Sequence, residues 1–336
     1  MSLAQNIQNA WNKNSKWLIV LRPLSWLYQA GFAFNKQLYK SGIKPTYTAP
    51  VPVMIIGNIT VGGSGKTPLL ISLVKYLQHK NIRVGVISRG YGGVGPFPAW
   101  VTLQSEPEQV GDEPCLIVQS TGVPMVVGAQ RQKNIELLLE SYDLDLIISD
   151  DGLQHWALNR QIEWIVLDNN RGLGNQKLLP EGYLREPVQR LQNSTVIEHA
   201  SAPNSLLNMQ LKVAEPYLLN PIEGQIELFD PNQNFYAMVG IGFPQRFYQT
   251  LENLELKHFQ CHEFPDHYDY KIDDLQFEDA NPIITTEKDA VKLLPLLKSH
   301  RNFNRAIWVV PVEAVLSEEC YDLLDQQLIE LGIQVS

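Results

Sequence analysis

The sequence predicts an α/β fold with a mostly parallel sheet, helices on both faces, a smaller C-terminal α/β domain and an N-terminal amphipathic helix. Two observations carry this prediction. Short apolar runs alternate with helical patterns between residues 52 and 167, which is typical of parallel sheets. A glycine-rich turn follows the first run directly, at the edge of a sheet where ligands bind. The 336 residues suit one large domain or two smaller ones.

The first expected element is a helix within residues 17–39, where large apolar side chains are frequent. Polar residues would share one of its faces, namely Arg22, Ser25, Gln29, Lys36 and Lys40. Apolar and aromatic residues would share the other, namely Trp17, Val20, Leu21, Leu24, Leu27 and Tyr28. Such a helix favours the headgroup region of a membrane, so we predict a membrane-surface segment over residues 1–45.

Two other interpretations of this segment remain open. A transmembrane span requires about 20 apolar residues, and Arg22, Pro23 and Gln29 interrupt the run. A helix packed against the protein core is also compatible with the pattern. A cleaved signal peptide is disfavoured, because no small-residue cleavage site follows a clean apolar stretch.

The charge of the chain is divided unevenly. Residues 1–105 contain eleven basic residues and no acidic residue, whereas the remainder contains 16 basic and 36 acidic residues. This asymmetry predicts a face directed towards an anionic surface, such as a membrane with anionic lipids, or towards anionic substrates. We expect no nucleic-acid partner.

The next elements form the predicted core, residues 46–225. Strands are expected at 52–57, 84–88, 124–128, 144–149 and 162–167. Helices are expected near 67–80, 111–120 and 131–141. The alternation fades in a proline-containing stretch at 171–225, and strand-like runs return at 235–241, 282–286 and 306–312. We therefore assign residues 226–336 to a smaller domain that closes over the core.

The glycine-rich turn has the composition of a phosphate-binding loop. It reads Asn-Ile-Thr-Val-Gly-Gly-Ser-Gly-Lys-Thr-Pro at residues 58–68. Its backbone N–H groups can converge on phosphates, Lys66 supplies a charge at the β- and γ-phosphates, and the Thr67 hydroxyl suits Mg²⁺. The predicted nucleotide-binding residues are Thr60, Val61, Gly62, Gly63, Ser64, Gly65, Lys66 and Thr67. Thr60 stands where the usual pattern has its first glycine, so an ordinary glycine-rich turn is the alternative.

Two acidic pairs are candidates for chemistry. Asp150 and Asp151 end an apolar strand, where a carboxylate of a phosphate-loop protein reaches the Mg²⁺ shell. Asp112 and Glu113 open a predicted helix, and an aspartate is a common group to accept or orient a hydroxyl proton. Taken alone, either pair is more often a helix cap or turn, but the phosphate loop upstream favours a metal-binding role for Asp150 and Asp151.

Other residues give weaker signals individually. His155 follows the Asp150–Asp151 pair, and His267 lies in a loop of the second domain. Arg89 follows a predicted strand, and Arg171 lies beyond the last core strand. The segment Thr-Glu-Lys-Asp at 286–289 differs from a guanine-binding loop, because its lysine comes one position late. The three cysteines are far apart and predict neither a disulfide framework nor a zinc site.

Together the motifs resemble the tetraacyldisaccharide 4′-kinases, also called lipid A 4′-kinases. The matching segments are 57–58, 61–68, 88–92, 111–114, 150–155, 171–175, 184–187 and 286–289, in the family's order. Thr60 agrees with this family, whose loop also lacks the first glycine. Glu181 departs from it, since the family has a small residue there, and we assign Glu181 no role.

The resemblance implies an ATP- and Mg²⁺-dependent lipid kinase on the cytoplasmic face of the bacterial inner membrane. It would phosphorylate the 4′-hydroxyl of an acylated glucosamine disaccharide 1-phosphate and yield lipid IVA. Asp112 with His267 would activate the hydroxyl, together with Lys66 as a catalytic residue. Thr67 and Asp150 or Asp151 would bind the metal. Substrate contacts are expected at Asn58, Arg89, Gln154, His155 and Arg171.

Two rival functions remain compatible with the residues alone. A phosphate-loop kinase of a soluble small molecule would leave the N-terminal helix unexplained. A membrane-associated nucleotide switch would hydrolyse nucleotide without forming a phosphorylated product.

Overall fold

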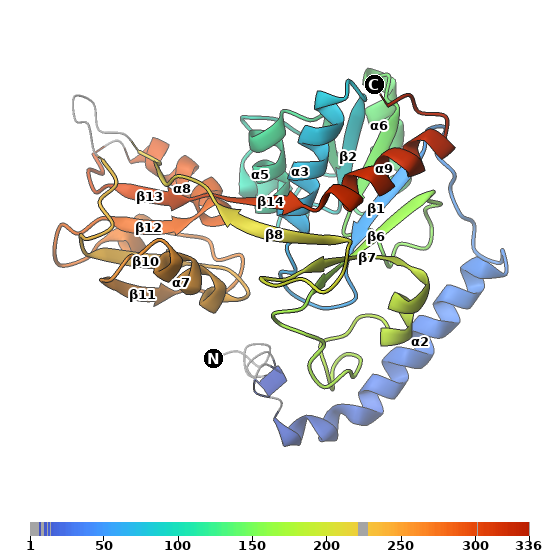
Figure 1. The fold of residues 1–336 in the computed structure, drawn as a ribbon, viewed down its shortest axis with the longest axis horizontal. Helices are drawn as coiled ribbons and strands as arrows, with labels where there is room; N and C mark the ends of the chain where they lie inside the picture. Colours follow the sequence, from blue (N-terminus) through green and yellow to red (C-terminus); the bar gives the residue numbers. More distant parts are fainter. Residues whose placement is uncertain are drawn as a thin grey trace.

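The computed structural model describes residues 7, 10, 11, 13, 15–220, 228–300 and 302–335. In this part of the chain, a nine-stranded and a five-stranded sheet form two adjacent lobes, and a long helix lies along the outside of the larger lobe (Figure 1). The predicted α/β class is therefore confirmed.

The large sheet has the strand order β14-β8-β7-β6-β1-β5-β2-β4-β3. Its strands are β1 (Val53–Gly57), β2 (Val84–Ser88), β3 (Ala99–Val101), β4 (Met125–Val127), β5 (Leu146–Asp150), β6 (Ile162–Asp168), β7 (Thr195–His199), β8 (Asn208–Val213) and β14 (Val312–Leu316). All strands from β8 to β4 pair in parallel, whereas β14 and β3 are antiparallel at the two edges. The carboxyl ends of the parallel strands therefore meet at a common edge.

Helices cover both faces of the large sheet because its central strands are apolar on both sides. In β1, Met54 and Ile56 pack towards α3 (Lys66–His79), α5 (Asp112–Thr121) and α9 (Glu318–Glu330). Val53 and Ile55 pack towards α6 (Arg131–Ser141) on the opposite face. The short helix α4 (Pro107–Val110) leads into α5. The alternation follows from the two-residue period of a strand.

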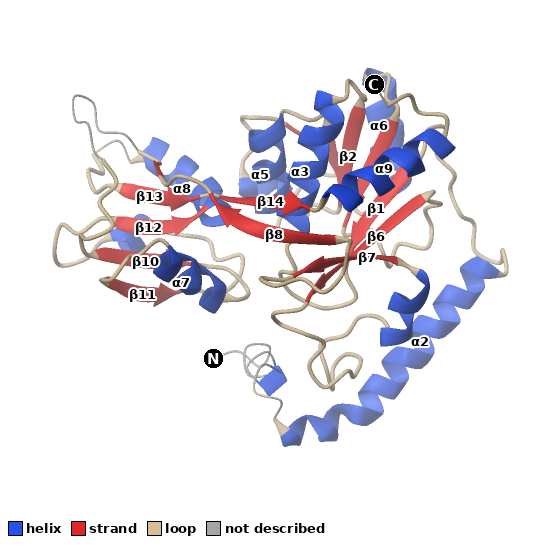
Figure 2. Cartoon of the chain, viewed as in Figure 1, coloured by secondary structure: helices blue, strands red, loops and turns tan. Residues whose placement is uncertain are grey.

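The smaller lobe repeats this layered arrangement around a sheet of order β11-β10-β12-β13-β9. Its strands are β9 (Tyr217–Leu218), β10 (Phe235–Val239), β11 (Phe259–Glu263), β12 (Ile283–Thr286) and β13 (Ile307–Val310). The helix α7 (Pro244–Asn253) packs on one face and α8 (Glu287–Ser299) on the other, with η3 (Ile272–Leu275) beside α8. Figure 2 shows the two sets of strands joined by the β8 and β14 ribbons.

The structure differs from the prediction in the boundaries of the two lobes and in the number of strands. The prediction placed residues 226–336 together, but β14 pairs with β8 in the large sheet and α9 packs over α3. The small lobe is thus an insertion, because its sheet spans only residues 217–310 between β8 and β14. The strands β7 and β8 were also missed within the stretch 171–225, since buried Glu198 and His199 interrupt the apolar pattern of β7.

The predicted N-terminal helix is present as η1 (Lys16–Leu21) and α2 (Arg22–Lys40). Part of its predicted polar face contacts the protein, because Arg22 pairs with Glu181 and Ser25 is buried, whereas Gln29 and Lys40 are exposed. Tyr28, which we had placed on the apolar face, also turns inward and donates a hydrogen bond to the Arg185 carbonyl. Large apolar side chains remain exposed on an outer face, defined here by Trp17, Val20, Leu24, Trp26, Leu27 and Phe34.

The structure narrows the alternatives for this segment. In the described part of the chain, no helix combines the length and the apolar character that crossing a membrane requires. The helix does pack against the large lobe through Arg22, Ser25 and Tyr28, but this packing leaves its outer face uncovered, because Val20 is 73 % and Leu27 70 % exposed. Part of the predicted 1–45 segment, including residues 1–6, lies outside the described residues.

Candidate active site

The glycine-rich loop lies between β1 and α3, as the sequence predicts. Gly62 and Gly65 have φ angles of +97° and +90°, which glycine adopts at little cost. Lys66 is the first residue of α3, so the loop places the N–H groups of this helix end next to its charge. Thr67 follows within the first turn. The local backbone therefore has the geometry of an anion-binding loop.

Asn58 supports this loop from beneath. Its Nδ2 lies within hydrogen-bonding distance of Thr60 Oγ1 at 3.2 Å and Ser64 Oγ at 3.1 Å, and its side chain is fully buried. The predicted contact of Asn58 with the substrate stays a prediction, and the structure shows this side chain bonded to the loop. A buried amide that bonds two loop hydroxyls fixes the shape of the loop.

A second segment, residues 178–185, braces the loop from the side. The Val61 N–H donates to the Tyr183 carbonyl at 2.8 Å, and the Arg185 N–H donates to the Ile59 carbonyl at 2.7 Å. Arg171 adds a guanidinium that donates to the Val61 carbonyl at 2.5 Å and lies over the Tyr183 ring. Arg171 is thus adjacent to the loop, as expected for a residue near the phosphates.

The carboxylates at the end of β5 differ in their surroundings. Asp151 lies 3.6 Å from Lys66 Nζ and 2.8 Å from Arg185 Nη1. Burial disfavours its ionised form, but these two cations outweigh burial and lower its pKa to about 2. Asp150 is more deeply buried, and burial together with the charges of Glu113 and Asp151 raises its pKa to about 7. Its Oδ1 has no hydrogen-bond partner in the described structure.

Asp112 and His267, 155 residues apart in the chain, meet across the two lobes. Asp112 opens α5, and His267 lies in the loop after β11. His267 Nδ1 is 3.0 Å from Asp112 Oδ2 and 3.1 Å from Oδ1. His267 has a φ of +58°, a strained value that a non-glycine residue adopts when its surroundings enforce it.

The pKa of Asp112 reflects two opposing effects. Burial of the carboxyl group favours the neutral form. The hydrogen bond with His267 and the charge of Lys288 outweigh burial and lower the pKa to about 2. Asp112 is therefore ionised at neutral pH and accepts hydrogen bonds. The charge of Glu113, its neighbour in the chain, is one of the causes that raise the pKa of Asp150.

The other predicted substrate residues take different positions. Arg89 is exposed at the carboxyl end of β2 and is available to a ligand at this edge. Gln154 donates to Glu186 at 2.8 Å and to the Asn58 carbonyl at 3.2 Å, so its amide serves the protein scaffold. Burial and nearby arginines lower the pKa of His155 to about 4, so its ring is neutral at pH 7.

Two basic residues of the site were not predicted. Lys288 belongs to the Thr-Glu-Lys-Asp segment and contacts the carboxylates beside His267. Arg131 is buried and donates to the Asp150 and Gly128 carbonyls at 3.1 Å each. The first segment matches the kinase family in sequence, but its pattern alone does not indicate which carboxylates Lys288 contacts. No sequence signal distinguishes Arg131 from an ordinary surface arginine of a helix.

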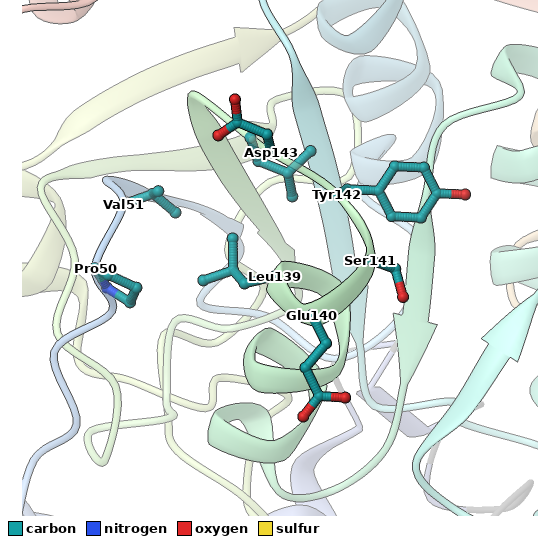
Figure 3. A pocket seen from close by; sticks show the side chains of 8 residues that line it. Pro50, Val51, Leu139, Glu140, Ser141, Tyr142 and Asp143 are labelled. Atoms are coloured by element: carbon teal, nitrogen blue, oxygen red, sulfur yellow. The ribbon is translucent and has the colours of Figure 1, made fainter.

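A cavity of about 390 Å³ lies away from these residues. It is lined by residues that include Pro50, Val51, Leu139, Glu140, Tyr142 and Asp143 (Figure 3). These residues precede β1 and β5, at the amino ends of the strands. Asp150 and the phosphate loop lie at the opposite edge, where ligands of parallel sheets bind, so we assign this cavity no catalytic role.

Comparison with known proteins agrees with this arrangement. A family model described as tetraacyldisaccharide-1-P 4′-kinase matches residues 17–329. The chain is 47 % identical to the tetraacyldisaccharide 4′-kinase of Psychrobacter cryohalolentis, covering all of this chain and 99 % of the relative. It is 41 % identical to the same kinase of Ectopseudomonas mendocina, covering 98 % and 99 %.

A solved structure is also similar. The crystal structure of LpxK from Aquifex aeolicus in complex with ATP aligns with a TM-score of 0.75 at 27 % identity. The alignment covers 94 % of this chain and 99 % of that one.

Proposed function

The chain belongs to the tetraacyldisaccharide-1-phosphate 4′-kinase family, and on this basis we propose how its residues perform the family's reaction. The enzyme transfers the γ-phosphoryl group of ATP to the 4′-hydroxyl of the acylated glucosamine disaccharide 1-phosphate and forms lipid IVA, a step of lipid A synthesis. The observation that carries the proposal is the contact of Asp112 with His267 across the two lobes, in a chain whose turn between β1 and α3 has the form of a phosphate-binding loop.

We infer that the loop holds the phosphates of ATP. The N–H groups from Gly62 to Thr67 lie at the start of α3, where they and the helix dipole favour negative charge. Lys66 now pairs with Asp151 at 3.6 Å, a separation that leaves the ammonium able to turn towards the β- and γ-phosphates. Arg171 and exposed Arg89 would add positive charge on two further sides.

The residues at the end of β5 fit a Mg²⁺ ion. Asp150 Oδ1 is buried without a hydrogen-bond partner, and Asp151 adds a second carboxylate beside it. Oxygen donors of this kind, with the Thr67 hydroxyl, are those that Mg²⁺ prefers. The ion would offset negative charge on the phosphates when bound. Arg131 holds the Asp150 carbonyl and thereby fixes the position of this strand end.

Asp112 and His267 would orient the sugar hydroxyl. A carboxylate with a pKa of about 2 is a poor proton acceptor at neutral pH, but it is a strong hydrogen-bond acceptor. Phosphoryl transfer through a loose transition state requires positioning more than early proton removal. We therefore infer that Asp112 aligns the hydroxyl and holds His267, whose other ring nitrogen lies 3.9 Å from Asp266.

The exposed apolar face of η1 and α2 supports a membrane-surface location. Trp26 is 64 % and Phe34 66 % exposed, whereas apolar faces of helices in globular proteins normally face the core. Burial of this face in the outer part of a bilayer, with Lys40 near the headgroups, would bring the site to an acylated substrate. We propose the cytoplasmic face of the inner membrane, where ATP is available.

A labelling assay tests the activity. γ-Labelled ATP, Mg²⁺ and detergent-dispersed disaccharide 1-phosphate should give labelled lipid, and Lys66→Ala should abolish this label. Lys75→Ala is the matched control, because Lys75 lies on the same helix with a half-exposed side chain that pairs with Glu313 at 3.7 Å.

Other outcomes separate the rival functions. Intact ATP binding without lipid labelling would contradict the proposed acceptor and favour a soluble one. Partner-dependent hydrolysis without any phosphorylated product would favour a nucleotide switch.

A further inference from the structure

Lys288 occupies the junction of the two lobes. It lies in the first turn of α8, whose Val291 packs in the core of the large lobe with Cys115 and Val118 of α5. The Lys288 side chain is only 19 % exposed. A lysine ammonium is strongly hydrated in water, so its partial burial requires compensating partners.

Three carboxylates supply this compensation. Lys288 Nζ lies 3.2 Å from Glu113 Oε1, 3.3 Å from Asp266 Oδ1 and 3.8 Å from Asp112 Oδ2. Asp112 and Glu113 belong to α5 of the large lobe, whereas Asp266 precedes His267 in the small lobe. The ammonium is thus shared between the two sides of the Asp112–His267 contact.

The charges show what Lys288 does there. Without it, three carboxylates would face one another across the contact, and their repulsion in a partly buried place would separate the lobes. A compact ammonium with three donors can serve three acceptors at once. Its charge also favours the ionised form of Asp112.

We propose that Lys288 is a positioning residue, which holds Asp112 and His267 within hydrogen-bonding distance by joining the carboxylates of the two lobes. The proposal rests on the kinase activity inferred above and adds a residue to it. Lys288 acts through Asp112, so its effect on turnover should depend on the Asp112 charge.

The test is a double-mutant cycle in the lipid-labelling assay. Lys288→Met should lower kcat by about 10- to 100-fold, because a displacement of about 1 Å at the reacting centre can cost about 10²-fold. The KM for ATP should change by less than about twofold, because Lys288 does not touch the phosphate loop. In an Asp112→Asn background, the same change should cost less than about threefold.

Two further variants test whether the loss of kcat in Lys288→Met arises from misfolding. Lys288→Arg keeps the charge and should recover part of kcat relative to Lys288→Met. Lys298→Met removes a lysine from the exposed end of the same helix and should leave kcat unchanged. Thermal unfolding of each variant shows whether the fold is retained.

The outcomes separate this proposal from the proposed function. An equal cost of Lys288→Met in both backgrounds would overturn it, as would an equal loss in Lys288→Arg or a higher KM with unchanged kcat. A wild-type protein that fails to label lipid would instead overturn the proposed function.

Discussion

Asp112 is the residue on which the site's electrostatics depend most. Its carboxylate is 4 % exposed, yet it is held ionised by His267 and Lys288. A buried charge with compensating partners is characteristic of a functional site, although structural ion pairs also produce it. Measuring kcat and the free energy of unfolding after replacement of Asp112 therefore separates a role in turnover from a role in stability.

The first prediction concerns turnover. Asp112→Asn keeps the size of the side chain but removes its charge, so the sugar hydroxyl and His267 lose their anionic acceptor. We expect kcat to fall by about 10²–10⁴-fold with a smaller change in KM. Steady-state kinetics with the lipid acceptor measure this. A change confined to KM would make Asp112 a binding residue.

The second prediction concerns acid stability. The folded pKa of Asp112, about 2, lies below the ordinary value of 3.8, so ionised Asp112 stabilises the fold above pH of about 4. This contribution, about 2 kcal/mol by linkage, is lost as the pH falls towards 2. Denaturant unfolding of wild type and Asp112→Asn between pH 2 and 7 should therefore converge at the acid end. If the difference in unfolding free energy between wild type and Asp112→Asn did not change with pH, the prediction would be contradicted.

The element with the most unusual contacts is α2. Its inner side holds residues 178–185: Arg22 donates two hydrogen bonds to Glu181 Oε1 at 3.0 and 2.8 Å, and Ser25 Oγ donates to the Leu178 carbonyl at 2.9 Å. The same segment bonds Val61 on its other side. The helix α2 and the phosphate loop are thus joined through one short segment, and Glu181 has a role that the family comparison of the sequence did not suggest.

The third prediction tests this connection. Arg22→Met leaves the buried Glu181 carboxylate without its partner, so it should lower the melting temperature. Arg22→Met with Glu181→Met removes both charges and should be more stable than the single variant. Exposed Lys40→Met on the same helix is the control. A double variant no more stable than Arg22→Met would show that the two side chains do not interact.

At the scale of the whole molecule, we propose that the exposed apolar face and the basic residues of α2 act in the same direction. The face supplies area that water does not solvate well, and Lys36 and Lys40 would attract anionic lipids, whereas Lys75, Lys80 and Arg83 pair with carboxylates of the large lobe. The remaining chain is acidic and would be repelled. The protein should therefore approach a membrane with α2 foremost.

The fourth prediction addresses this orientation. Leu24→Ser with Leu27→Ser should weaken binding to anionic vesicles by at least about tenfold, since each buried leucine side chain contributes about 1.5–3 kcal/mol. ATP affinity should not change, because both side chains point away from the protein. Vesicle sedimentation at low and high salt separates this apolar contribution from the screened electrostatic one. Unchanged binding at both salt concentrations would exclude α2 as the main anchor.

How much of the fold and the site can be predicted from the sequence depends on how far apart in the chain the interacting residues lie. Most strands and helices between 52 and 168 were predictable because their periodicity and the glycine-rich loop are local signals. The short elements β3 (Ala99–Val101) and α4 (Pro107–Val110) were missed, because three or four residues show no periodicity. The position of β14 depends on pairing with Lys212 and its neighbours a hundred residues earlier, which no local pattern encodes. The contacts of Lys288 with Asp112 and of Arg22 with Glu181 likewise arise only once the lobes and α2 are packed.

The insertion of the small lobe between β8 and β14 has a consequence for biosynthesis. The helix that begins at Lys66 is covered by α9, through contacts such as the Tyr76 hydroxyl with Asp325 at 2.8 Å. A ribosome releases α9 only after the entire small lobe has been made. Until then the part of α3 that packs against β14 and α9 is exposed to water, and the nascent chain is a candidate for chaperones. We expect a ribosome-bound chain to acquire tight nucleotide binding late, after residues 312–330 have emerged.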